Sequence, residues 1–120
     1  MTSVYLKQAV RKMETHTGQG PNLEFAATSC QGWRNTQEDM HLVLPKFEHD
    51  TSLFAVFDGH NGAEVAIFVA KYLPDYIRGN KKYRKGNVVD GLKEAFLLLD
   101  SSILMRESMD ELREIRKYAL

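Results

Sequence analysis

The chain has 120 residues, of which 43% are hydrophobic and 27% charged, a balance typical of one globular domain. Sixteen basic and sixteen acidic side chains cancel, so no overall positive field is present to hold nucleic acid or an anionic membrane. The single cysteine, Cys30, excludes an intrachain disulfide and suits a reducing compartment. No apolar run reaches the ~20 residues that span a bilayer, and no signal-peptide core is visible. We therefore expect an intracellular protein, cytoplasmic or nuclear.

The first 20 residues are interpreted as a lead-in, and residues 21–120 as the domain itself. Residues 4–13 suit either a short helix or a segment that lies along another element. Two glycines and a proline at positions 18–21 then break the chain.

Three segments have the length and composition of strands. The first covers residues 23–30 (LEFAATSC), and a polar turn follows it over residues 31–39. The second covers residues 40–44 and should stop at Pro45, because proline cannot donate to a strand ladder. The third is the apolar run LFAVF at residues 53–57, which is too short for a typical helix and is predicted to be a strand buried on both faces.

Helical periodicity follows the strands. Residues 62–78 predict an amphipathic helix that Pro74 should bend or end early. After a basic loop, residues 88–105 predict a second helix, and Ser108 with Glu111 forms a capping box that would start a third. The side chains that the second helix is expected to bury are Leu92, Ala95, Phe96, Leu99 and Ile103. About three strands followed by two or three helices indicate the α+β class, with helices on a largely antiparallel sheet.

Two polar clusters carry the candidate chemistry: residues 34–39 (RNTQED) and residues 58–62 (DGHNG). The second begins where the expected buried strand ends, so its acidic residue has rigid support yet faces outward. Carboxylates and an accessible glycine carbonyl are hard oxygen ligands that suit Mg²⁺ or Mn²⁺. A nearby arginine can bind phosphate, and a histidine can protonate a leaving oxygen. Together these groups supply what hydrolysis of a phosphate ester needs.

Taken singly, each signal has an ordinary alternative. Asp-Gly is a common turn dipeptide, and the Glu-Asp pair, the arginine and the histidine are each typical of solvated surfaces or turns. Trp33 is interpreted as a side chain packed under the loop, and Cys30 as a small buried one. The basic loop at residues 81–86 is interpreted as solvated, with a docking patch as the alternative.

The order of the clusters resembles a known family. Residues 18–41 (GQGPNLEFAATSCQGWRNTQEDMH) are similar to the first motif of the metal-dependent protein serine/threonine phosphatases of type 2C, the PPM family. Residues 53–62 (LFAVFDGHNG) are similar to its second motif. The stretches KYLPDYIR and GLKEAFLLLD look closest to the family's gamma-type branch. The resemblance covers residues 18–100 and implies a β-sandwich flanked by helices, of which this chain holds the N-terminal part.

The resemblance also implies metal ligands. Asp58 would bridge two ions, Mg²⁺ or Mn²⁺, and Glu38 and the Gly59 carbonyl would bind one of them. Asn61 stands where the family more often has a small residue, a departure that leaves these ligands intact.

Three further residues receive catalytic roles by the same resemblance. Asp39 would orient a water, Arg34 would hold the substrate phosphate, and His60 would act as general acid toward the leaving oxygen. The implied partners are proteins that carry phosphoserine or phosphothreonine.

Length is the main departure from the family. The family domain is considerably longer, and further aspartates in its C-terminal half complete the metal centre, whereas nothing after Asp100 resembles those motifs. The expectation is therefore either a truncated N-terminal half of a phosphatase, missing its C-terminal half and inactive alone, or a non-catalytic interaction module derived from one. A nuclease or another phosphoesterase is a third possibility, which the zero net charge disfavours.

Overall fold

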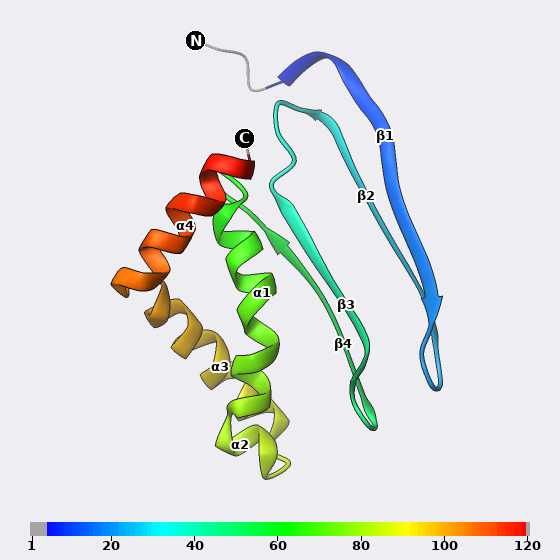
Figure 1. Cartoon of the computed structure of the whole chain (residues 1–120). Coiled ribbons are helices and arrows are strands. Elements are labelled where there is room, and N and C mark those ends of the chain that lie inside the picture. The colour runs from blue at the N-terminus through cyan, green and yellow to red at the C-terminus, as the bar shows by residue number, and fades with distance from the viewer. Residues whose placement is uncertain (1–4, 120) are drawn as a thin grey trace.

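The computed structural model describes residues 5–119, in which four strands are followed by four helices (Figure 1). The strands are β1 (Tyr5–Gln19), β2 (Glu24–Arg34), β3 (Asp39–Glu48) and β4 (Thr51–Asp58). The helices are α1 (Glu64–Gly79), α2 (Lys81–Arg84), α3 (Val88–Ile103) and α4 (Arg106–Ala119). The expected α+β class is confirmed, with one more strand and a short additional helix than the sequence indicated. No helix within residues 5–119 is both long enough and apolar enough to cross a membrane.

The strands form two antiparallel hairpins that lie side by side (Figure 1). β1 pairs with β2, and β3 pairs with β4, in separate two-stranded sheets. Aromatic side chains join the hairpins: the ring of His16 stacks on that of His41 at 5.5 Å between centroids, and the rings of Phe25 and Phe54 lie 6.1 Å apart. The hairpins therefore meet through side chains.

The core lies where the helices cover β3 and β4. α1 contacts both of these strands on one side and α3 and α4 on the other, so it is the central helix (Figure 1). Its Leu73 and Ile77 are each 1% exposed and pack with Leu99 of α3, Leu112 of α4 and Phe47 of β3. Burial of this apolar stripe supplies most of the stability of a small domain, because helix propensity alone is marginal.

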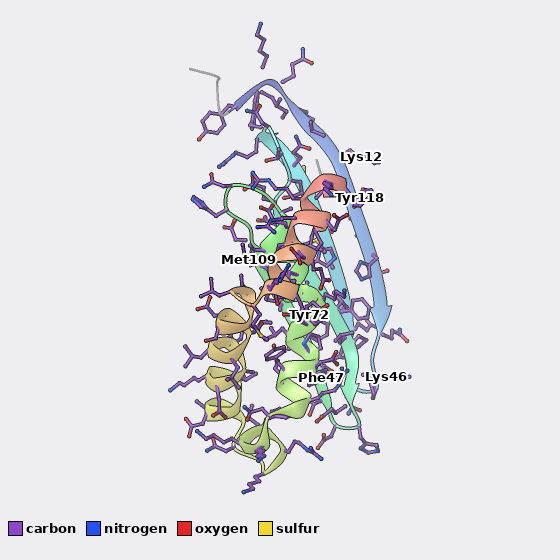
Figure 2. All side chains as sticks on the ribbon, turned by 60° about the vertical axis from the view of Figure 1, so that its left-hand side comes forward. Lys12, Lys46, Phe47, Tyr72, Met109 and Tyr118 are labelled. Carbon is purple, nitrogen blue, oxygen red and sulfur yellow. The ribbon has the colours of Figure 1, made fainter. Side chains whose placement is uncertain are left out.

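Strand β1 corrects the expectation for the start of the chain. Residues 5–19 pair with β2 along a register that runs from Tyr5 opposite Arg34 to Gln19 opposite Glu24, so of the two alternatives for residues 4–13 the helix is wrong. Residue 4 lies outside the described residues. Figure 2 shows Lys12 projecting outward from β1. Because β1 exposes most of its side chains, it lacks the apolar alternation that would have revealed a strand.

The other strands run further than their sequences indicated. β2 continues to Arg34, and β3 continues through Pro45 to Glu48. The prediction that Pro45 ends the strand is wrong because the β3–β4 register shifts between Leu44 and Glu48, so the missing N–H falls in an irregular stretch. The Ser52 hydroxyl donates to the Pro45 carbonyl at 2.7 Å.

Strand β4 packs against the core through one face only and that face is partly buried, so the prediction that LFAVF is buried on both faces is wrong. Leu53 and Phe57 pack against the core, whereas Phe54 and Val56 are 45% and 74% exposed. The helices cover the first face, and nothing in residues 5–119 fully covers the second.

Two helix predictions are also wrong. α1 continues past Pro74 to Gly79, so of the two effects expected of this proline the early end is wrong. Pro74 is itself buried, and its packing offsets the lost hydrogen bond. α4 begins at Arg106, so Ser108 lies within the helix and forms no capping box. Glu111 instead accepts hydrogen bonds from α1. On α3, Phe96 is 50% exposed, since the helix presents other residues to the core.

Candidate metal and phosphate site

The β3–β4 hairpin brings the predicted acidic residues to one end of the sheet. In the antiparallel register, Asp39 at the start of β3 lies opposite Asp58 at the end of β4. The Gly59 N–H donates to the Glu38 carbonyl at 3.2 Å, which extends the pairing one step beyond the strands. Residues that are about 20 positions apart in sequence are thus neighbours, at the edge where β4 leads toward α1 (Figure 1).

The loop between β2 and β3 is held by its own polar side chains. The Thr36 hydroxyl donates to Glu38 Oε1 at 2.9 Å. The Gln37 amide donates to the Cys30 carbonyl at 3.2 Å, and its oxygen accepts from the Asp39 N–H at 3.2 Å. These contacts orient the Glu-Asp pair. The sequence argument gave neither Thr36 nor Gln37 a role, although a hydroxyl and an amide just before paired acids in a turn are the available signal.

Position 59 has no room for a side chain, so glycine is required there. A Cβ at this position would lie 2.4 Å from the Glu38 carbonyl oxygen and 2.7 Å from that of Gly62, closer than real contacts allow. Asn61 follows with φ of 56° and Gly62 with φ of 134°, so the turn into α1 uses left-handed backbone. The turn therefore lies directly against the acidic loop.

The two loops enclose a polar pocket of about 230 Å³. Five of the six predicted site residues line it: Arg34, Glu38, Asp39, Asp58 and Gly59. The remaining lining residues are Cys30, Gln31, Thr36 and Gln37. His60 is exposed on the turn and is not part of the pocket wall. Cys30 is exposed as well, and Trp33 is 56% exposed, so the expectations that these two side chains are buried are wrong.

The carboxylates affect each other's protonation. Partial desolvation raises the pKa of Asp39 although this residue is exposed, and the charge of Asp58, a hydrogen bond with it and the charge of Glu38 raise that pKa further. Two like charges this close disfavour double ionisation, and a cation bound between them would relieve the repulsion.

The donor atoms of the pocket fit a hard divalent cation. Glu38, Asp39 and Asp58 offer carboxylate oxygens and Gly59 a carbonyl, the ligand types that Mg²⁺ and Mn²⁺ prefer. Within residues 5–119, however, no three carboxylate, histidine or cysteine side chains gather closely enough to hold a metal by themselves. The chain thus offers part of a coordination shell, which suits Mg²⁺ because this ion keeps several waters.

Arg34 places a positive charge on the same pocket. It is the last residue of β2, and its guanidinium lies 5.9 Å from the ring centroid of Tyr5 on the neighbouring strand. The Gln31 amide donates to the Arg34 carbonyl at 2.8 Å, which fixes the backbone. An arginine that lines the same pocket as the carboxylate residues is suited to bind a phosphate group.

Comparison with known proteins identifies the family of the chain. The family model "Protein phosphatase 2C" matches residues 23–116, which include the whole pocket. The chain belongs to the protein phosphatase 2C family. It is 45% identical over 112 residues to Protein phosphatase 2C 1 of Paramecium tetraurelia, an alignment that covers 93% of this chain and 37% of that protein. It is 41% identical over 93 residues to Protein phosphatase 1G of Mus musculus, which covers 78% of this chain and 17% of that protein.

These comparisons confirm the resemblance drawn from the two motifs, including the similarity to the gamma-type branch of the protein phosphatase 2C family. The chain spans a little over a third of the length of the Paramecium relatives and less of the mouse one. The strands and helices described above are therefore consistent with the N-terminal part of the family fold.

Proposed function

We propose that this chain is the N-terminal part of a Mg²⁺- or Mn²⁺-dependent phosphatase that hydrolyses phosphoserine and phosphothreonine in proteins. The observation that carries the proposal is the pocket in which Arg34 shares a wall with the facing carboxylates Asp39 and Asp58. Positive charge for a phosphate and hard oxygen donors for a cation meet there in a member of the protein phosphatase 2C family. The presence of a single cysteine favours an intracellular site of action, in the cytoplasm or nucleus.

Asp58, Glu38 and the Gly59 carbonyl would hold the metal. Two ions in the complete domain would supply an activated water and neutralise the charge that develops on the phosphate. The chain's own residues hold these oxygens in place. The Thr36 hydroxyl orients the Glu38 carboxylate, and the tight turn at Gly59 brings the Gly59 backbone against the loop that contains Glu38.

Three residues would act on the substrate and the attacking water. Arg34 would bind two phosphate oxygens through its planar guanidinium. Asp39, next to Asp58, would accept a hydrogen bond from the attacking water and orient it. His60 would donate a proton to the serine or threonine oxygen as it leaves, from its exposed position beside the pocket.

A non-catalytic role is the second candidate, and two observations favour it. Within residues 5–119, no three side chains of metal-binding type lie close enough together to hold an ion. The chain also spans only 37% of the length of the Paramecium relative. On this hypothesis residues 21–120 pair with another chain that holds the remaining ligands, or compete for such a chain's partner. Turnover of the 120-residue chain with Mn²⁺ that Asp58→Ala abolishes would exclude the non-catalytic role. Absence of turnover is expected under both candidates, so substitutions in a longer protein decide between them.

The proposed roles are tested by substitution in a longer protein that contains this segment. Asp58→Ala should remove most activity, because a carboxylate that would hold the metal is lost. Arg34→Ala should weaken phosphate binding. His60→Ala should slow phosphoserine peptides by about 10²–10⁴-fold, the usual contribution of a general acid, while leaving p-nitrophenyl phosphate nearly unchanged, since an activated phenol needs no proton.

His49→Ala is the matched control, because this histidine is also exposed but lies at the far end of the β3–β4 hairpin. It should change neither substrate's rate. Equal losses on both substrates with His60→Ala would refute the general-acid role, and full activity of Asp58→Ala would refute the metal assignment.

A further inference from the structure

A short basic turn lies at the end of α1 that is remote from the pocket. Between residues 76 and 89 the sequence contains five lysines and arginines and no aspartate or glutamate. Four of these basic residues are Lys81, Lys82, Arg84 and Lys85, which form α2 and its C-terminal cap. All four are exposed, in a chain whose overall charge is zero. We call these four residues the basic turn.

The charges of the basic turn are largely uncompensated. Within residues 5–119, Lys81, Arg84 and Lys85 make no ion pair, and Lys82 reaches Glu94 only at 3.9 Å. By contrast, three basic side chains near the end of α4 all contact carboxylates. The positive potential at the turn is therefore available to a partner.

The backbone of the basic turn is held in place by contacts with α3 and β3. Asn80, which is 6% exposed, accepts from the Lys82 and Tyr83 N–H groups at 2.9 and 3.1 Å and donates to Glu94 at 2.8 Å. The Tyr83 hydroxyl donates to Glu48 of β3 at 2.9 Å. Gly91 of α3 lets the helix approach so closely that a Cβ there would lie 2.7 Å from the Tyr83 nitrogen. A fixed backbone lowers the entropy lost when a ligand orders the side chains.

We propose that the basic turn binds an acidic peptide segment of a partner protein. The four-residue helix α2 is about 6 Å long, which matches two or three residues of an extended peptide at about 3.3 Å each. Nucleic acid fits less well, because the turn offers few charges and its one aromatic ring, Tyr83, is half-buried with its hydroxyl engaged.

The bound segment would leave the phosphatase pocket open. The basic turn follows the C-terminal end of α1, and the pocket loop precedes its N-terminal end (Figure 1). A helix of 16 residues separates them by about 24 Å. The inference does not depend on catalysis, so it holds or fails independently of the proposed function.

The test measures binding of a fluorescein-labelled octaglutamate peptide to the 120-residue chain by fluorescence anisotropy at low salt. The triple variant Lys81→Gln, Arg84→Gln, Lys85→Gln should weaken binding about tenfold, because three exposed charge pairs with the peptide are lost. The double variant Lys81→Arg, Lys85→Arg keeps the charges and should bind like the natural chain. Raising the salt to 0.15 M should weaken binding further, because the contacts are exposed.

Strand β1 offers a matched control. Lys7, Arg11 and Lys12 are also exposed, comprise the same residue types, and change the net charge equally when all three become glutamine. This control should lose less than about twofold. Equal losses of octaglutamate affinity in both triple variants, or no loss in the variant of the basic turn, would overturn the proposal. It would also be overturned if the substitutions in the basic turn weakened binding of a single-stranded oligonucleotide more than binding of octaglutamate. Circular dichroism confirms that both triple variants are folded before binding is compared.

Discussion

Two leucines on α3, two residues apart, test which face of that helix carries the fold. Leu99 is 2% exposed and packs with Leu73 and Ile77, whereas Leu97 is 69% exposed. Both positions lie well inside the helix, so substitution by alanine changes helix propensity equally. Any difference between Leu99→Ala and Leu97→Ala therefore reports burial alone.

The expected difference is large. Removing a fully buried leucine side chain costs about 2–5 kcal/mol, through lost transfer free energy and the cavity that remains. Leu97→Ala should change the free energy of unfolding by less than about 0.5 kcal/mol, as exposed substitutions do. A typical small domain is stable by only about 5–15 kcal/mol, so Leu99→Ala should lower the melting temperature by roughly 10 °C or more.

Urea unfolding followed by circular dichroism at 222 nm measures both variants, at two protein concentrations tenfold apart. Equal destabilisation by the two substitutions would refute the assignment of faces. If Leu97→Ala destabilises only at the higher concentration, self-association covers the outer face of α3, and the account of an exposed face in the monomer is contradicted.

Two further predictions follow from the described contacts. Phe54 and Val56 give the open face of β4 an exposed apolar surface, so replacing both by threonine should reduce self-association of the chain. Size-exclusion chromatography measures the association, and the helical circular dichroism signal should stay the same. Unchanged association would contradict this prediction. Hydrogen bonds from Lys71 and Tyr72 lower the pKa of Glu111. Their contribution to the stability of the folded state is therefore fully present above the ordinary glutamate pKa near 4.5, and this contribution is lost as the pH falls through the lowered pKa. Glu111→Gln should flatten the decline of stability below about pH 5, and an unchanged pH profile would refute it.

The sequence predicted those parts of the fold that have a one-sided apolar pattern. α1 and α3 have apolar stripes at helical spacing, so both helices are predictable. On α3 the expected core residues Ala95 and Leu99 are buried, whereas Phe96 is not. β1 was not recognised as a strand because nearly all of its side chains are exposed, and a strand without a buried face leaves no period in the sequence. The strand end expected at Pro45 and the early helix end expected at Pro74 are both wrong, because the tolerance of these prolines depends on a register shift and on packing, which only the folded chain shows.

The candidate site was more predictable than the fold around it. Its acidic residues stand at opposite ends of the two strands of a hairpin, so antiparallel pairing alone brings Asp39 and Asp58 together. The contacts of Thr36 and Gln37 were missed, since they depend on the loop's conformation. The position of His60 outside the pocket wall was not predictable either, because the left-handed turn that follows it sets its direction.

The central claim is that this chain holds a partial site for a divalent metal. The most direct test is a Mn²⁺ titration of the 120-residue chain, in which nuclear magnetic resonance measures the broadening of each backbone amide signal. Two carboxylates and one carbonyl form only part of a shell, so we expect millimolar affinity at best, an order-of-magnitude value from that ligand count. Broadening should begin in the loops at residues 36–39 and 58–60 and should be lost in Asp58→Asn but not in the exposed control Asp100→Asn. Broadening that begins elsewhere, or submicromolar binding that survives Asp58→Asn, would contradict the account.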